Sequence, residues 1–268
     1  MPRARITDGL ELSYELFGDE GNPVVVLIRG TGASGSRWMP QVEAYRDEFR
    51  VLIFDNRGVG ESDTPPGPYT VAEMAADTVA LLDALGIDRC HVSGSSLGGA
   101  IGCHIAIEQP ERVLSLQLHS SWLATHGYTA FSLGLLKRFL VVGGVDFYYE
   151  AALPLLFSPT FMSHEQDRLM GILEHMKAHS ATYDGLLGQL EANLSHDLRA
   201  RAGEIGAPTL VTVGELDYLL PVAASAELQQ AIPDAELYVF AGGPHLVTME
   251  TPELFNEITL SWLRKVTG

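Results

Sequence analysis

The stretch Gly94-Ser95-Ser96-Leu97-Gly98 decides the fold, because it joins an apolar strand to a helix through a turn that requires small residues. The predicted strand before it is Cys90-His91-Val92-Ser93, and the predicted helix after it covers residues 97–107. Glycines two positions before and after a serine let the backbone turn sharply and lift the serine side chain above the sheet. Ser96 is therefore a candidate nucleophile. The backbone N–H of Leu97 lies at the start of the helix, where it can stabilise an oxyanion.

The length and net charge of the chain limit the kinds of molecule that it is expected to bind. The chain has 268 residues, enough for one large domain or for a core with an insertion. Its 34 acidic and 17 basic residues give a net charge of −17, which disfavours nucleic acid and anionic membranes as partners. The charge does not identify a substrate, and the small-molecule substrate that we expect follows from the motifs below. Nothing in the composition indicates an oligomeric state.

The cysteines and the hydropathy of the chain indicate the cellular compartment in which we expect the protein. Cys90 and Cys103 fall on a predicted strand and a predicted helix, which indicates buried free thiols rather than a disulfide framework. The N-terminal residues lack the apolar core of a signal peptide. The longest apolar run, residues 131–145, is interrupted by Lys137-Arg138, so we expect no membrane-spanning segment. These features predict a cytoplasmic protein.

Strands and helices alternate along most of the chain. Residues 6–14 are predicted to form a hairpin around Asp8-Gly9. Short continuous apolar runs are typical of strands buried on both faces of a parallel sheet, and they occur at residues 24–28 and 51–54. Further strands are predicted at residues 113–118, 209–213 and 237–240. Helical spacing of apolar residues follows several of these runs, as in residues 71–85 and 253–266. The pattern predicts an α/β fold with a mostly parallel, doubly wound sheet.

One long segment departs from this alternation. Residues 122–203 contain no strand-like run, only helix-like stretches separated by Gly143-Gly144, Pro154, Ser158-Pro159 and Gly185. Because the segment lies between two predicted core strands, we expect it above the carboxyl ends of the sheet, where such folds bind ligands. The sequence therefore predicts a core domain of residues 1–121 and 204–268 and a helical cap of residues 122–203.

A serine nucleophile needs a base, which in turn needs an acid to orient it. His245, in Gly242-Gly243-Pro244-His245, follows the last predicted strand and is the candidate base. Asp217 follows the preceding strand and is the candidate acid, with Glu215 as the alternative. Serine, acid and histidine then all follow strands, so they meet at one edge of the sheet in the chain order Ser, Asp, His. We expect Ser96, Asp217 and His245 to be the catalytic residues.

The loop after residues 24–28 is expected to complete the oxyanion hole. It contains Arg29-Gly30-Thr31-Gly32, and we expect the Thr31 N–H to act beside the Leu97 N–H. His175 and His179 have the spacing of a helical metal pair but lack the glutamate of a zinc-binding HExxH motif. Nucleotide-binding motifs are also absent from the sequence, so we expect neither a metal nor an organic cofactor.

Together these motifs resemble those of the α/β-hydrolase fold superfamily over nearly the whole chain. The matching pieces are the elbow at residues 94–98, the loop Asp55-Asn56-Arg57-Gly58-Val59-Gly60-Glu61-Ser62, Asp217, and Gly243-Pro244-His245 with Pro252-Glu253 after it. The chain is similar to the branch that contains serine esterases, enol-lactonases and cofactor-free haloperoxidases. This resemblance implies an α/β-hydrolase fold with a helical cap insertion, and hydrolysis without a cofactor.

The chain departs from that family at one position near the expected pocket. The family usually has His-Gly where this chain has Arg29-Gly30. Arg29 either anchors the loop or contacts an anionic or strongly polar group of the substrate. Arg29 and Gly30 are both candidate substrate contacts.

The cap is expected to supply the apolar wall of the pocket. Its candidate contacts, each of which could instead pack the cap against the core, are Trp122, Phe131, Phe147 and Leu156. The function predicted from all these features is a serine hydrolase that cleaves an ester or lactone of a small to medium, largely apolar molecule. Alternatives are a C–C hydrolase, an elimination or cyclisation enzyme that uses the same triad, and a ligand-binding receptor-like protein.

Overall fold

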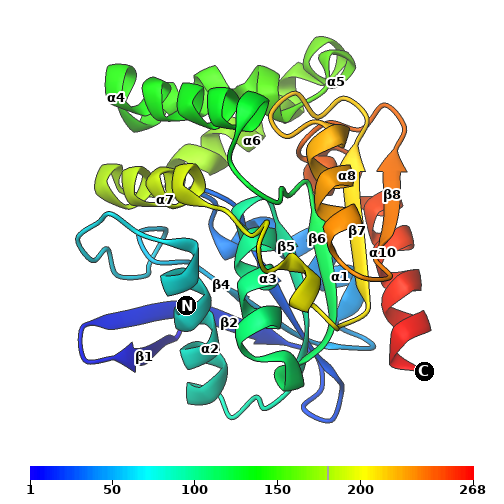
Figure 1. Ribbon diagram of the computed structural model, residues 1–268. Coiled ribbons are helices and arrows are strands. Elements are labelled where there is room, and N and C mark those ends of the chain that lie inside the picture. The colour runs from blue at the N-terminus through cyan, green and yellow to red at the C-terminus, as the bar shows by residue number, and fades with distance from the viewer. Residues whose placement is uncertain (180) are drawn as a thin grey trace.

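The computed structural model describes residues 1–179 and 181–268, which form a central sheet with helices on both faces (Figure 1). The sheet has eight strands in the order β1-β2-β4-β3-β5-β6-β7-β8. The N-terminal hairpin pairs antiparallel, both within itself and with β4, and every other neighbouring pair is parallel. The chain therefore has the mostly parallel, doubly wound α/β-hydrolase fold that the sequence predicted.

The strands closely follow the predicted ranges. They are β1 Arg3–Thr7, β2 Leu10–Phe17, β3 Val24–Ile28, β4 Arg50–Phe54, β5 Cys90–Ser95, β6 Val113–His119, β7 Thr209–Gly214 and β8 Glu236–Phe240. The helices are α1 Met39–Tyr45, α2 Val71–Ala84, α3 Leu97–Glu108, α4 Gly127–Leu156, α5 Pro159–His164, α6 Gln166–Ala178, α7 Tyr183–Ser195, α8 Val222–Ala231, α9 Val247–Glu250 and α10 Pro252–Thr267. Single 3₁₀ turns occupy Gly35–Trp38, Pro110–Arg112 and Ala202–Glu204.

The central strands are apolar on both sides because both faces of the sheet are covered. In β3, Val26 and Ile28 pack into the cluster beneath α2 and α3, whereas Val25 and Leu27 pack into the cluster beneath α1 and α10. Successive side chains of a strand point to opposite faces, so a continuous apolar run supplies both cores at once. This burial holds the carboxyl ends of β3, β5, β7 and β8 at one edge of the sheet, where the candidate site forms.

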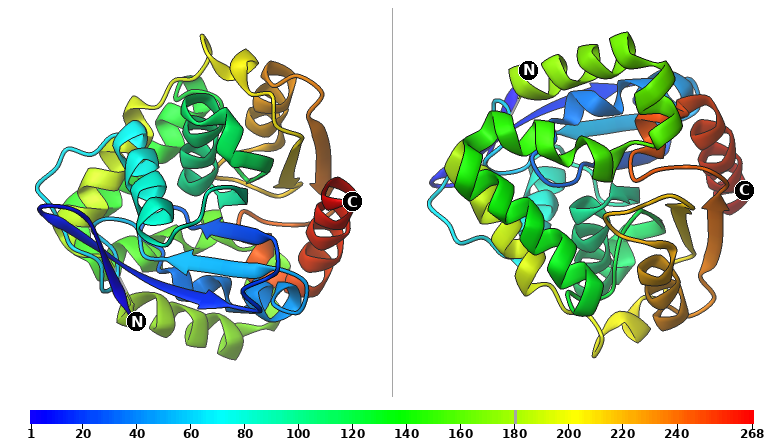
Figure 2. Two further views of the ribbon diagram at one scale, coloured as in Figure 1. Left: turned by 90° about the horizontal axis from the view of Figure 1, so that it is seen from below. Right: turned by 90° about the horizontal axis from the view of Figure 1, so that it is seen from above.

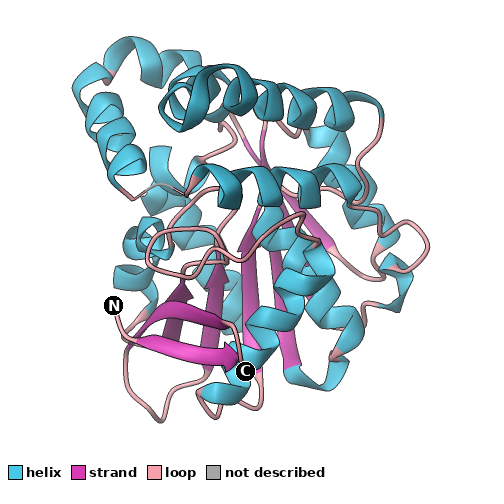
Figure 3. Cartoon of the chain, turned by 90° about the vertical axis from the view of Figure 1, so that its left-hand side faces the viewer, coloured by secondary structure: helices cyan, strands magenta, loops and turns pink. Residues whose placement is uncertain are grey.

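Helices α4 to α7 lie between β6 and β7 in the chain and cover the carboxyl ends of the parallel strands (Figures 1 and 3). The view from above shows α4 passing over the top of the molecule (Figure 2, right). Helix α4 continues through Gly144, whose backbone (φ 77°, ψ −171°) introduces a kink. Gly185 lies within the first turn of α7 and does not interrupt it, contrary to the separation expected there. Its place is explained by a close contact, because a Cβ atom on Gly185 would lie 2.2 Å from the carbonyl oxygen of Gly58.

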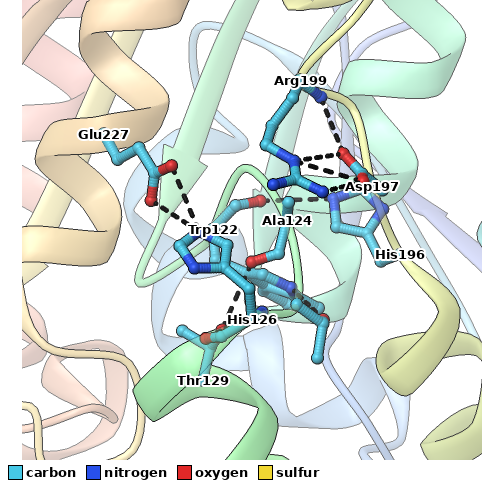
Figure 4. Close-up of polar contacts among 9 residues, drawn as sticks. Trp122, Ala124, His126, Thr129, His196, Asp197, Arg199 and Glu227 are labelled. Atoms are coloured by element: carbon cyan, nitrogen blue, oxygen red, sulfur yellow. Dashed lines mark hydrogen bonds and ion pairs between the residues drawn. The ribbon is translucent and has the colours of Figure 1, made fainter.

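The two connections between this helical segment and the sheet run alongside each other (Figure 4). The N–H of Thr125 donates to the carbonyl of His196 at 2.8 Å, and the N–H of Leu198 donates to the carbonyl of Leu123 at 3.0 Å. His126, at the start of α4, also lies 3.2 Å from the carboxylate of Glu227 on α8. The chain therefore enters and leaves the segment through one hydrogen-bonded pair of connections.

Helix α4 extends well beyond the apolar run at residues 131–145. By length and composition alone it is long and apolar enough to cross a membrane, with a mean hydropathy of 1.4 over 18 residues, of which 28% are buried. Lys137 and Arg138 interrupt the apolar run and lie within the helix. Its inner face packs on α6 and α7, and its outer face exposes apolar side chains that include Phe131 and Val142.

Candidate active site

Ser96 occupies a strained turn between β5 and α3. Its backbone angles are φ 55° and ψ −119°, a left-handed conformation that is unfavourable for a residue with a side chain. The turn closes because its glycines allow backbone to approach backbone. A Cβ on Gly94 would lie 2.1 Å from the carbonyl oxygen of Gly98, and a Cβ on Gly98 would lie 2.1 Å from that of Ile28. The elbow predicted from the sequence is therefore present.

His245 and Asp217 form a buried pair next to the elbow. Nδ1 of His245 lies 2.7 Å from Oδ2 of Asp217, and both side chains are almost fully buried. The other carboxylate oxygen of Asp217 accepts the N–H groups of Leu219 and Leu220, at 3.0 and 2.8 Å. With Nδ1 held by the carboxylate, Nε2 is the ring nitrogen of His245 left to exchange a proton with a neighbour.

The loops after β7 and β8 are held against each other, and this brings Asp217 to His245. The N–H of Leu216 donates to the carbonyl of Gly243 at 2.7 Å. Glu215, the alternative acid, instead accepts the N–H of Gly242 at 2.8 Å on the exposed side of the loop. The structure therefore places Asp217, and not Glu215, on the histidine.

A pocket lies between the elbow and the helical segment. Ser96 and His245 both line it, together with Arg29, Gly30 and Thr31 of the loop after β3. A Cβ on Gly30 would lie 2.9 Å from Cβ of Ser96, so this loop contacts the elbow directly. Ser96, His245 and the loop after β3, all of which the sequence motifs indicated, therefore lie on one side of the same pocket.

Three side chains of the helical segment hold the loop after β3 in place. Asn193 donates to Oγ1 of Thr31 at 2.8 Å, and the N–H of Gly32 donates to Oε1 of Gln189 at 2.8 Å. The hydroxyl of Tyr149 donates to the carbonyl of Gly32 at 2.6 Å. These contacts could not be predicted from the sequence, because a polar side chain on an amphipathic helix gives no sign of which distant loop it will contact.

The opposite wall of the pocket is largely apolar and comes from α4 and α6. It includes Leu156, as predicted, and also Leu133, Leu136, Tyr148, Tyr149, Ala152 and Met176. The predictions for Phe131 and Phe147 are wrong as to position, because these side chains are 74% and 43% exposed on the outer surface of α4. Trp122 is fully buried and its indole N–H donates to Thr125, so it packs at the junction with the core and does not line the pocket. Helical spacing identified an apolar helix but not which of its faces points inward.

Two histidines in the sheet lie away from the pocket. His119 is buried between Ser93 and Thr212, at 2.9 and 2.8 Å, and its pKa is lowered to about 3, mainly by burial. His91 lies 2.8 Å from Oγ of Ser115, and burial lowers its pKa to about 4. These neutral imidazoles pack the sheet.

His175 and His179 lie together near the end of α6. Their ring centroids are 4.2 Å apart, and Nε2 of His175 lies 3.4 Å from the hydroxyl of Ser36. Within residues 1–179 and 181–268, no group of three or more His, Cys, Asp or Glu side chains could hold a metal ion.

Comparison with known proteins agrees with this architecture. The family model described as alpha/beta hydrolase fold matches residues 23–252. A protein of Azorhizobium caulinodans named "Putative carbamate hydrolase RutD" is 33% identical over 266 residues, which cover 99% of this chain and 99% of that protein. The crystal structure of the enol-lactonase from Burkholderia xenovorans LB400 is similar, with a TM-score of 0.90, 29% identity and coverage of 98% of this chain and 100% of that one.

A thermophilic esterase from Thermogutta terrifontis is also similar in structure, with a TM-score of 0.88 at 27% identity and coverage of 99% of each chain. The esterase and enol-lactonase branch suggested by the motifs is thus represented among these relatives. From the matched family model and the shared architecture, the chain belongs to the α/β-hydrolase superfamily and is a hydrolase of that fold.

Proposed function

We propose that this protein is a serine hydrolase that cleaves an ester or lactone through a Ser96-His245-Asp217 triad and an acyl-enzyme. The observation that carries the proposal is the buried His245–Asp217 contact of 2.7 Å in the same pocket as the strained Ser96 turn. A histidine that is oriented by a carboxylate and shares a pocket with a serine hydroxyl is the arrangement that makes serine nucleophilic.

In this mechanism Ser96 Oγ attacks the carbonyl carbon while Nε2 of His245 takes the hydroxyl proton. Asp217 keeps Nδ1 protonated and stabilises the imidazolium that forms. The same proton is then delivered to the leaving alkoxide oxygen as the ester bond breaks. Water, deprotonated by His245, hydrolyses the acyl-enzyme and frees Ser96. Apart from the substrate and water, every reacting group in these steps belongs to the protein.

The N–H groups of Leu97 and Thr31 are the proposed donors to the tetrahedral oxyanion. Leu97 begins α3, so its N–H lies at the positive end of a helix. Thr31 is positioned by Asn193, and the neighbouring Gly32 is fixed by Gln189 and Tyr149. Rigid donors lower the barrier because they need no reorganisation when the charge develops.

A carbamate is the second candidate substrate. The relatives named as carbamate hydrolases share about a third of their residues with this chain over nearly its full length. A carbamate carbonyl is attacked by the same serine and needs the same oxyanion donors, so the site geometry suits both. We also propose that the protein acts on a small molecule in the cytoplasm, in keeping with its two buried free thiols, Cys90 and Cys103.

The test is hydrolysis of p-nitrophenyl butyrate, a small lactone and a p-nitrophenyl carbamate by the wild type and by Ser96→Ala. We expect Ser96→Ala to lower kcat on the order of a thousandfold or more, because the members of a triad act as a unit. Ser163→Ala, at an exposed position on α5, is the matched control and should keep full activity. Rapid release of one equivalent of nitrophenol before steady turnover would report the acyl-enzyme.

Three results would contradict the proposal. Equal activity of Ser96→Ala and wild type would show that Ser96 is not the nucleophile. Binding of all three compounds without turnover would favour the receptor-like alternative instead. If the enzyme cleaved a vinylogous 1,5-diketone but hydrolysed neither the ester, the lactone nor the carbamate, C–C hydrolysis would be favoured.

A further inference from the structure

Two arginines with buried side chains line the same pocket as Ser96 and His245. Arg29 is 2% exposed and Arg37 is 6% exposed. Arg29 follows β3, and Arg37 lies in the 3₁₀ turn just beyond, so both belong to the segment that also carries the proposed oxyanion donor. Within residues 1–179 and 181–268, neither guanidinium has a carboxylate within 4.0 Å.

Neutral groups hold the side chain of Arg29. Its Nη1 donates to Oγ1 of Thr248 at 3.2 Å, and its Nη2 donates to the carbonyl of Arg37. The guanidinium carbon lies 3.9 Å from the centre of the Trp38 ring. Its buried Nε has no hydrogen-bond partner among the described residues. These contacts fix the orientation of the guanidinium without neutralising its charge.

Arg37 is held in a similar way. Its Nη2 donates to the carbonyl of Met176 at 3.4 Å, and its guanidinium carbon lies 5.6 Å from the centre of the Tyr149 ring. Its Nε is also buried with no partner among the described residues. Asp55, the one carboxylate that favours the charged form of Arg37, already accepts the N–H groups of Gly35 and Glu61 with its two oxygens.

Two buried positive charges in one pocket lower the stability of the folded protein unless a negative charge lies nearby. Burial lowers the pKa of Arg29 well below its ordinary value, and the charge of Arg37 lowers it further. Buried charges in proteins are normally paired or are used to bind a ligand. Asp55 acts on Arg37 only from beyond ion-pair distance, and the residues that line the pocket include no acidic side chain that could pair with either guanidinium.

We propose that Arg29 and Arg37 form a subsite for a carboxylate, so that the substrate is an ester or lactone bearing a free carboxylate on an otherwise apolar body. The planar guanidinium matches a carboxylate with two parallel hydrogen bonds, which fixes both position and orientation. This inference rests on the proposed hydrolase function and names its substrate class. It also gives Arg29 the second of the two roles left open by the sequence.

The experiment compares two esters of the same length that differ in one charge. They are mono-p-nitrophenyl glutarate, which keeps a free carboxylate, and its methyl diester, which has none. The wild type should hydrolyse the anionic ester with a kcat/KM about ten- to a hundredfold higher. Arg29→Met and Arg37→Met should each remove most of that preference, mainly by raising the KM for the anionic ester.

Arg138→Met is the control, because Arg138 is an exposed arginine on the outside of α4 and does not line the pocket. It removes the same charge from the molecule and should leave the preference intact. If Arg138→Met lowered the preference as much as Arg37→Met, general electrostatic attraction would explain it and the subsite would be wrong. Circular dichroism checks that the buried variants fold, and Arg37→Lys offers a milder change that should weaken the preference while keeping the charge.

Binding of glutarate itself separates this inference from the proposed function. Isothermal titration of glutarate into wild-type protein and Ser96→Ala should show saturable binding in both, competitive with the anionic ester. Wild-type hydrolysis of both esters with equal kcat/KM and no glutarate binding would overturn the subsite and leave the hydrolase function standing. Glutarate binding without turnover of either ester would overturn the hydrolase function for these compounds and support the anion subsite alone.

Discussion

The buried histidine at the end of β6 makes stability depend on pH. Burial, helped by the charge of Arg29, lowers the pKa of His119 to about 3, whereas an unfolded chain has a histidine pKa of about 6.5. Between these values the unfolded chain takes up a proton that the folded chain does not. The contribution of His119 to the free energy of unfolding should therefore fall as the pH falls below about 6.5, by about 1.4 kcal/mol for each pH unit.

His119→Gln tests this expectation, because the amide keeps polar contacts with Ser93 and Thr212 but does not titrate. Between pH 6.5 and 5 the wild type should lose about 2 kcal/mol more than the variant, as measured by urea unfolding. His164→Gln, at an exposed position on α5, should lose as much as the wild type. Parallel losses in wild type and His119→Gln would show that His119 does not drive the acid sensitivity.

At the scale of elements, α7 is seated on the core by contact between two glycine backbones. A Cβ on Gly185 would lie 2.2 Å from the carbonyl oxygen and 2.5 Å from Cα of Gly58, both of which are main chain and cannot turn away. Nearby, the N–H of Thr182 donates to the carbonyl of Gly58 at 3.3 Å. The same helix carries Gln189 and Asn193, so its position also decides where the loop after β3 lies.

The same substitution on two neighbouring helices should therefore have opposite effects. Gly185→Ala should lower the free energy of unfolding by about 1–3 kcal/mol, because the added methyl forces α7 away from Gly58. Gly171→Ala, on the exposed side of α6 with no atom within 4 Å of the new Cβ, should raise it by about 0.5–1 kcal/mol. Urea unfolding of both variants measures the two changes. Stabilisation by Gly185→Ala would mean that α7 does not rest on Gly58 in solution.

Elements with a strong local signal were predictable, and those that depend on a distant contact were not. The elbow could be placed because Gly94 and Gly98 are demanded by the turn itself. Asp217 and His245 could be placed because each follows a strand, and parallel strands end at one edge. Arg37 was missed, since a single arginine between a serine and a tryptophan has no spacing or periodicity that marks it as buried. Arg37 is buried because Tyr149 of α4 and Met176 of α6, which are distant in the sequence, pack against it in the folded protein.

At the scale of the whole molecule, the pocket exists because two parts of the chain face each other. The strand ends supply the polar residues, and α4 and α6 supply most of the apolar ones. Periodicity located α4 but did not separate its faces: Leu136 and Leu156 line the pocket, whereas Phe131 lies outside. An isolated helix of this composition carries no local information about which side will be covered.

Substrate choice should accordingly follow the inner face of α4. Leu136→Ala leaves space in the pocket wall, so kcat/KM for p-nitrophenyl octanoate relative to the butyrate should rise by about tenfold. Phe131→Ala removes a larger side chain from the same helix, but that side chain is 74% exposed, so the ratio should change less than about threefold. Both ratios come from initial rates measured under identical conditions. An unchanged ratio in Leu136→Ala together with a shifted one in Phe131→Ala would place the acyl group against the outer face of α4, outside the pocket that contains Ser96.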